Sequence, residues 1–373
     1  MPTHATTDRR EDQAQRKNYL LFHPTCDTMR TTFTDCVSPT TPYVERAGLK
    51  STEVQKYEKL KFSEMMGLSP WRERFRQAMI ALRGEEDVPP SRFGLSSLRQ
   101  LRPRYGIPLW LGKQPVHRKV LLTNLWNHTQ TPIEDGWSVK KTQVKDFRGR
   151  RLTYDSHNGT DFSIPIGTRV LTAAPGEVVS VMSEFNRGGL KVFIDHGEGL
   201  MTCYAHLARN LVQVGDRVTR GQVIALSGYS GLDSLVTFPF GVPHVHFNTW
   251  LNNESIDPFA FQGETSMWRG GGLPQPWDGE EEKDEVPFTP SHYNEDVLRE
   301  VIEACKTPSV REHLLAIEDL SLRAAQTIIQ MNYYPTRFPK KYNLYDKTYL
   351  RSPRMDLPFS REDFDGVAFV DEL

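Results

Sequence analysis

The chain has 373 residues, of which 38% are hydrophobic and 25% are charged, and its formal net charge is −1. This composition is typical of a globular protein, and the length exceeds that of most single domains. A charge so close to zero gives no general reason to expect nucleic acid or an acidic membrane as a partner. The four cysteines are scattered without a CxxC pair, which argues against a disulfide framework and a cysteine-rich metal site. They are Cys26, Cys36, Cys203 and Cys305, and we expect free thiols.

Residues 1–140 are interpreted as an N-terminal extension. Residues 1–50 are polar and predict an irregular segment. The apolar run at residues 19–22 is too short for the core of a signal peptide, and no later stretch approaches the ~20 apolar residues of a membrane span. We therefore expect no membrane span, and a cytoplasmic location by default unless the chain is exported by a non-classical route.

Two short helices are predicted in this extension, and the second has clear end signals. Ser69 is expected as its N-cap and Pro70 as its first helical residue, with Gly84 just past its end. Its apolar residues recur at helical spacing, which predicts a face directed into the core. These residues are Trp71, Phe75, Ala78, Met79 and Leu82. A strand is predicted at residues 119–122.

From residue 168 onward, short segments alternate apolar and polar residues and are separated by glycine. This pattern predicts strands at residues 170–174, 176–182, 190–195, 201–205 and 223–226. Residues 167–170 and 176–179 also resemble residues 215–218 and 221–224, a loose internal repeat. Such strands favour an antiparallel sheet over a βαβ arrangement, so we predict an α+β fold.

The C-terminal part is predicted to be a linker followed by helices. Glycines, prolines and an acidic run indicate a linker at residues 266–290. Asn294 is expected to cap a first helix, Thr307-Pro308 a second, and a third is predicted from Asp319 to about Met331. Residues 291–373 are therefore interpreted as a helical C-terminal extension.

Two short histidine motifs carry the chemistry. His244 and His246 are two residues apart, so on a strand their side chains point to the same face. His157 and Asp161 flank Asn158-Gly159, a turn signature, and we place them on a turn that enters a strand. Each motif alone is a weak signal, because a chance HxH is unsurprising among eleven histidines.

The combination is more specific. Two histidine nitrogens and one carboxylate oxygen, with a fourth position left to water, form the ligand set of a catalytic zinc site. Such a zinc ion lowers the pKa of bound water and polarises a carbonyl. Attack on an amide then requires a base and a donor for the oxyanion, which calls for further histidines near the metal.

About residues 145–260 closely resemble the M23 family of zinc metallopeptidases, the lysostaphin- and LytM-like endopeptidases. The resemblance implies that His157, Asp161 and His246 hold one zinc ion within a domain of residues 141–265. It also implies that His206 and His244 are unligated, one acting as general base and the other orienting water or stabilising the oxyanion. The matching segments, in family order, are His157-Asn-Gly-Thr-Asp161, Gly167-Thr-Arg-Val, Ala174-Pro-Gly-Glu-Val, Tyr204-Ala-His206-Leu, Gly215-Asp-Arg-Val-Thr-Arg-Gly-Gln, Pro243-His244-Val-His246-Phe and Ile256-Asp-Pro.

The sequence departs from the family pattern near the HxH motif. A longer apolar insert occupies residues 232–242, and Asn248 replaces the usual acidic residue after His-x-His-Phe. Both differences are expected to reshape the cleft. Tyr154 and Tyr204 are candidate hydrogen-bonding residues there, whereas His196 is expected to be structural.

The function predicted from these features is a zinc endopeptidase that cleaves peptidoglycan peptides or glycine-containing cross-bridges. One alternative is a non-catalytic M23-like binding or activating module, although such modules typically lose ligands and all five positions are present. A second alternative is a lipoyl- or biotinyl-carrier fold. That fold needs a modifiable lysine at a hairpin tip, and Lys191 lies in a predicted strand. The oligomeric state is not predicted.

Overall fold

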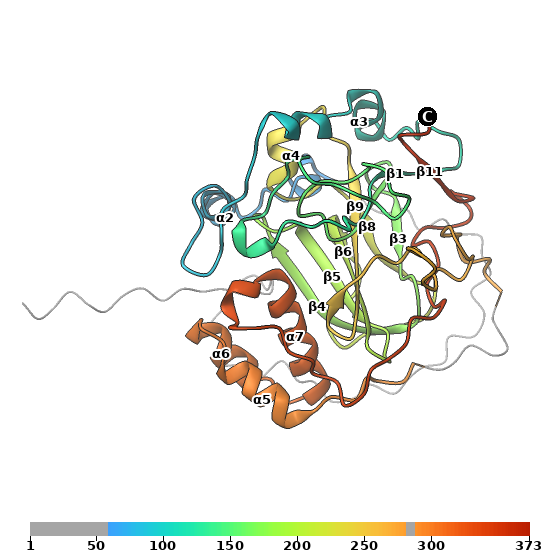
Figure 1. Cartoon of the computed structure of the whole chain (residues 1–373). Coiled ribbons are helices and arrows are strands. Elements are labelled where there is room, and N and C mark those ends of the chain that lie inside the picture. Colours follow the sequence, from blue (N-terminus) through green and yellow to red (C-terminus); the bar gives the residue numbers. More distant parts are fainter. Residues whose placement is uncertain (1–58, 281–287) are drawn as a thin grey trace, which may run out of the picture. The chain divides into compact units, whose positions relative to one another are not determined.

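A large, mostly antiparallel sheet runs through the part of the chain that this computed structural model describes, residues 59–280 and 288–373 (Figure 1). All these residues belong to one unit, Tyr57–Leu373. The irregular segment predicted for residues 1–50, including Cys26 and Cys36, lies outside the described residues. So does most of the acidic run.

The sheet has eleven strands, and its main path runs β11-β1-β2-β9-β6-β5-β4-β7. All pairs are antiparallel except β1 with β11. The strands are β1 (Val120–Asn124), β2 (Thr160–Ser163), β3 (Arg169–Leu171), β4 (Gly176–Glu184), β5 (Gly189–Asp195), β6 (Leu200–Asn210), β7 (Arg217–Val218), β8 (Val223–Ser227), β9 (His244–Leu251), β10 (Glu254–Ser255) and β11 (Val367–Phe369).

Every predicted strand is present, with ends shifted by a few residues, and the α+β fold is confirmed. The two halves of the internal repeat pair with each other, β3 with β8 and β4 with β7. The sheet includes β1 and β11, which lie outside residues 141–265. The division into residues 1–140, 141–265, 266–290 and 291–373 stays a prediction.

Ten helices and helical turns surround the sheet in the described residues. None of these helices is long and apolar enough to cross a membrane. They are α1 (Phe62–Met65), α2 (Trp71–Arg83), η1 (Leu95–Gln100), α3 (Pro103–Trp110), η2 (Ile133–Asp135), α4 (Leu232–Thr237), α5 (Glu295–Glu303), α6 (Pro308–Leu315), α7 (Leu320–Tyr333) and η3 (Pro335–Arg337).

The predicted orientation of α2 is wrong. Trp71, Phe75 and Leu82 are 71%, 64% and 53% exposed, whereas Arg74 and Gln77 are buried. The polar face of α2 is buried because its side chains form hydrogen bonds there. Arg74 donates to the Ser183 carbonyl and hydroxyl, and Gln77 accepts from the Phe185 amide. These contacts satisfy backbone groups where β4 ends, which apolar side chains could not do. The helix also begins one residue later than predicted, with Pro70 as its N-cap.

The three predicted C-terminal helices are present as α5, α6 and α7. Asn294 and Asp319 cap α5 and α7 through their side chains, as expected. Thr307 precedes α6 but makes no capping bond, because its hydroxyl donates to Asp87 instead. In Figure 1 these helices lie together beside β4 and β5.

Both faces of the central strands are covered. On β9, Asn248 and Trp250 follow the two histidines on one face, and there they meet Tyr333 of α7. Phe247 lies on the opposite face and stacks on Trp268, which is fully buried. Helix α7 therefore covers the part of this face of β9 that lies beyond His244 and His246.

Candidate metal centre and cleft

Strands β2 and β9 bring the predicted ligands together. Asp161 pairs with His246 across the two antiparallel strands, and Ser163 pairs with His244. Directly opposite residues have neighbouring side chains on the same face. His157 lies just before β2, after a turn closed by its own amide donating to the Tyr154 carbonyl. The expected placement of HxH on a strand is confirmed. His157 lies between a turn and a strand, as expected, whereas Asp161 already belongs to β2.

Three donor atoms converge on one point. His157 Nε2 lies 3.0 Å from Asp161 Oδ1 and 3.2 Å from His246 Nδ1. His246 Nδ1 lies 2.8 Å from the same carboxylate oxygen. All three residues are buried, and together they form a group that could hold a metal ion.

Hydrogen bonds on the side away from the site determine the tautomer of His157 and the Asp161 oxygen that faces the site. His157 Nδ1 lies 2.6 Å from the Leu125 carbonyl, which can only accept, so this nitrogen carries the proton and Nε2 presents a lone pair. Asp161 Oδ2 accepts from the Asn124 amide at 2.8 Å, which leaves Oδ1 for the site. Buried lone pairs that face one another need a shared cation, and the donor set therefore fits a metal ion.

Gly159 is required by a close approach. A Cβ atom at this position would lie 2.7 Å from His246 Nε2 and 2.7 Å from the Phe247 carbonyl oxygen. The turn that the Asn158-Gly159 pair predicts instead lies at Asp155 and Ser156. The glycine thus lets the loop carrying His157 pass directly over His246.

A β-bulge turns His206 towards the same site. Ala205 pairs with His246, so regular alternation would direct His206 to the opposite face of β6. His206 has φ of 60°, and the register between β5 and β6 shifts at this point. Bulges re-aim side chains beside functional sites, and positive φ in a non-glycine residue is a strained conformation. His206 consequently faces His244, with ring centroids 4.7 Å apart.

Backbone carbonyls also orient the two further histidines. His206 Nδ1 donates to the Ser230 carbonyl at 2.7 Å, and His244 Nδ1 donates to the Val242 carbonyl at 2.8 Å. In each ring the Nε2 atom is left as the proton acceptor. His244 Nε2 lies 3.5 Å from Asp161 Oδ1, and His206 Nε2 lies 3.9 Å from Asp233.

The protonation states follow from burial and neighbouring charge. Burial lowers the pKa of His206 well below its usual value, and the neighbouring His244 adds to the shift. Burial also lowers the pKa of His246. Burial opposes ionisation of Asp161, but the charges of His157 and His244 and hydrogen bonds from two histidines hold its pKa well below the usual value. At neutral pH, Asp161 is therefore an ionised carboxylate, and the rings of His206 and His246 are neutral.

The site opens into a cleft with three parts. The first, the central pocket of about 60 Å³, is lined by Tyr154, Arg187, His206, Asp233, His246 and Tyr333, among others. The second, the apolar groove of about 410 Å³, shares Tyr154 and Asp233 with the pocket and also contains His244. The apolar insert forms α4, and its Val236 lines this groove.

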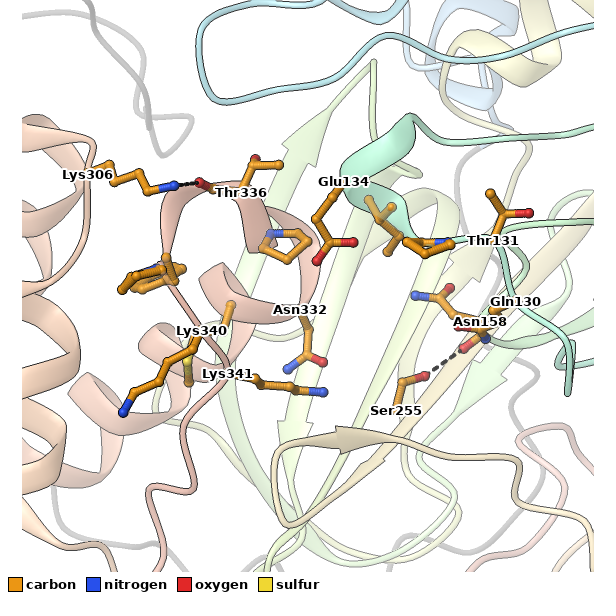
Figure 2. Close-up of a pocket in the computed structure, with 16 residues that line it drawn as sticks. Gln130, Thr131, Glu134, Asn158, Ser255, Lys306, Asn332, Thr336, Lys340 and Lys341 are labelled. Carbon is orange, nitrogen blue, oxygen red and sulfur yellow. Dashed lines mark hydrogen bonds between the residues drawn. The ribbon is translucent and has the colours of Figure 1, made fainter.

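The third part is the polar cavity of about 500 Å³, which shares Asn158 and Asn332 with the central pocket. Figure 2 shows Asn332 from α7 on one side and Asn158, hydrogen bonded to Ser255, on the other. The C-terminal extension therefore forms part of the cleft wall. The Tyr333 hydroxyl also donates to Asn248, which in turn donates to Asn158 next to His157.

Three other predicted residues lie away from the donor group. Tyr204 is fully buried and its hydroxyl accepts from the Ala173 amide, so the interpretation of Tyr204 as a cleft residue is wrong. His196 engages both ring nitrogens, with the Pro175 carbonyl and the Thr202 hydroxyl. Lys191 is buried in β5 and paired with Glu184 at 2.7 Å, which leaves it inaccessible to attachment of a carrier group.

Comparison with known proteins agrees with this geometry. Residues 155–258 match the model of peptidase family M23. This segment of the chain is an M23 domain. It contains all five residues of the predicted site, His157, Asp161, His206, His244 and His246.

Relatives of the M23 domain include a peptidoglycan endopeptidase and lysostaphin. Peptidoglycan DD-endopeptidase ShyA of Vibrio cholerae is 40% identical over 131 residues, which are 34% of this chain and 28% of that protein. Lysostaphin of Staphylococcus simulans is 31% identical over 125 residues, 32% of this chain and 24% of that protein. The solved catalytic domain of lysostaphin is 32% identical, covering 28% of this chain and 77% of that chain, with a TM-score of 0.25. The chain thus spans about a quarter of the length of these curated relatives.

Several residues that build the site have no sequence signal. Leu125, Ser230 and Val242 act through backbone carbonyls, so their side chains carry no pattern. Asn124 is the last residue of β1 and lies two residues beyond the strand predicted at 119–122, where it resembles any polar residue. Arg187 belongs to a loop, and only its burial in the folded chain distinguishes it.

Proposed function

We propose that this protein is a zinc-dependent endopeptidase that cleaves peptide bonds in peptidoglycan. The observation that carries the proposal is the convergence of three buried donor atoms, within hydrogen-bond distance of one another, beside two further oriented histidines.

His157, Asp161 and His246 would hold the zinc ion. Two imidazole nitrogens and one carboxylate oxygen suit zinc, and three protein ligands leave a coordination position open, as in catalytic sites. No cysteine joins the group in the described residues: Cys203 and Cys305 are free and buried elsewhere. When bound, zinc supplies Lewis acidity, which polarises a peptide carbonyl and makes a water molecule easier to deprotonate.

His206 and His244 would act on the attacking water. Each presents an unprotonated Nε2 to the cleft because its Nδ1 is held by a carbonyl. One would accept a proton from the attacking water and pass it to the leaving amine. The other would orient the attacking water by accepting a hydrogen bond from it at Nε2.

The substrate class is proposed from the relatives. Peptidoglycan DD-endopeptidase ShyA and glycyl-glycine endopeptidase ALE-1 are both related to the M23 domain. The cleft extends on both sides of the donor group, which suits an extended peptide.

Digestion of purified peptidoglycan and of glycine-rich peptides, with products identified by mass spectrometry, tests the proposal. We expect new peptide termini with the wild-type protein loaded with zinc, and none with His244→Ala. An absence of any cleavage by zinc-loaded wild type would contradict a peptidase of this substrate class.

A further inference from the structure

Arg187 differs from the other buried arginines of residues 59–280 and 288–373. Four arginines are no more than 8% exposed, namely Arg74, Arg187, Arg220 and Arg337. The other three donate hydrogen bonds to carbonyl, carboxylate, hydroxyl or amide oxygens. The guanidinium of Arg187 donates none within this part of the chain, and its Nε is buried without a partner.

The side chain lies in the cleft. Arg187 belongs to the connection between β4 and β5, is 7% exposed, and lines the central pocket together with His206 and His246. Its guanidinium lies over the Trp137 ring, 5.5 Å from the centroid. This cation–π contact covers one face of the fork and does not use its N–H donors.

No carboxylate of residues 59–280 and 288–373 pairs directly with this guanidinium, although Glu184 and Asp233 favour its charged form from a distance. Glu184 is already bound by Lys191 and by the Tyr334 hydroxyl, each at 2.7 Å. Asp233 lines the same pocket but forms no ion pair with Arg187. Burial lowers the pKa of Arg187, although an arginine side chain stays charged at neutral pH.

A buried, unpaired charge lowers the stability of the folded chain. Such a group is retained at functional sites where a ligand completes its interactions. The planar fork of a guanidinium matches the two oxygens of a carboxylate. The central pocket, at about 60 Å³, has room for a group of that size.

We propose that Arg187 binds a carboxylate of the substrate, so that the cleft selects peptides with a free carboxylate close to the cleaved bond. This inference rests on the proposed function. It favours an anionic stem-type peptide over a chain of glycines, since an uncharged glycine chain would leave Arg187 unpaired.

The test compares two synthetic peptides that differ only in a side-chain carboxylate or its primary amide. Four zinc-loaded proteins are compared, each with the whole chain: wild type, Arg187→Gln, Arg187→Lys and the control Arg83→Gln. Arg83 is an exposed arginine of α2. We expect wild type to prefer the carboxylate in kcat/KM by about 10-fold or more, the effect of a charged hydrogen bond. Arg187→Gln should lose the preference because it cleaves only the carboxylate peptide more slowly. Arg187→Lys should retain part of the preference. Equal losses on both peptides, or no preference in wild type, would overturn the proposal.

Two measurements without turnover separate this inference from the proposed function. In the first, the scissile amide of the carboxylate peptide is chemically reduced so that it cannot be cleaved, and the affinity for this peptide is measured by calorimetry. The affinity should fall about 10-fold in Arg187→Gln. The Tm of Arg187→Gln without peptide should equal or exceed that of wild type, because an unpaired buried charge is removed. A lower Tm with unchanged binding would show a structural role and refute the proposal. Binding that depends on Arg187, without cleavage of either peptide, would uphold carboxylate recognition while the peptidase proposal fails.

Discussion

At the scale of single residues, backbone carbonyls determine what the histidines can do. Three of the four site histidines donate Nδ1–H to a main-chain oxygen, so each directs an unprotonated Nε2 inward. Asn124 has the equivalent role for the carboxylate, because it occupies Asp161 Oδ2 and leaves Oδ1 for the metal. These outer contacts adjust the ligands before any ion binds.

Asn124→Ala should therefore weaken zinc binding without removing a ligand. Loss of such an outer contact typically lowers metal affinity about 10–100-fold. Competition with a chelator measures the affinity, and Asn343→Ala, at an exposed asparagine of the C-terminal stretch, serves as the control. An affinity equal to that of wild type would show that Asn124 does not support Asp161.

His196 should make the folded chain sensitive to acid. Burial lowers its pKa from 6.5 to about 3, so the unfolded chain binds a proton that the folded chain rejects between these values. Stability from this group is complete above pH 6.5 and is lost as the pH falls, by about 4 kcal/mol at pH 3. Urea unfolding from pH 7 to pH 4 should show a flatter pH dependence for His196→Gln than for wild type. Parallel curves would contradict the assignment.

At the scale of elements, the sequence predicts most of the strands and the placement of the HxH motif on one of them. Alternating residues identify β9, and the two-residue spacing of His244 and His246 places them on one face. The bulge at His206 could not be predicted, because the sequence pattern of β6 is regular and the positive φ arises from pairing with β5. The orientation of helix α2 could not be predicted for a similar reason, because polar contacts near the end of β4 determine which of its faces is buried.

Helix α7 is attached to the sheet by a buried polar cluster whose energy can be measured. Glu184 of β4 and Lys191 of β5 form an ion pair, and Tyr334, which directly follows α7, donates to Glu184. Breaking one partner of a buried pair typically costs about 3–5 kcal/mol, because the other charge is left unpaired. In a double-mutant cycle, the free energy of unfolding is measured with urea. Lys191→Met alone should lower it more than Lys191→Met and Glu184→Gln combined. Additive single effects would mean that the two side chains are not coupled.

At the scale of the whole molecule, the segments outside the M23 domain help to build the site. Strand β1 supplies Asn124, the following residue Leu125 supplies a carbonyl, and α7 supplies Asn332 and Tyr333 to the cleft. Asn124, Leu125, Asn332 and Tyr333 belong to no motif of the sequence, so the contribution of these segments could not be predicted. Their contacts are long-range, and no local pattern records which segment packs on which strand.

A chain restricted to residues 141–265 should consequently bind zinc more weakly than the full chain. It retains all three ligands but lacks Asn124, the Leu125 carbonyl and the cover over Trp250. The metal affinity and the urea unfolding curve of this fragment measure the loss. A fragment with full affinity and a cooperative transition would show that the extensions are dispensable for the site.

The most direct test of the account is the zinc content of three purified proteins, measured together with their cleavage of peptidoglycan. Wild type should contain about one zinc ion per chain and be active. His157→Ala should lose both zinc and activity, whereas His206→Ala should keep the zinc and lose the activity. Loss of zinc from His206→Ala, or a metal-free wild type that still cleaves, would contradict the assignment of three ligands and two catalytic histidines.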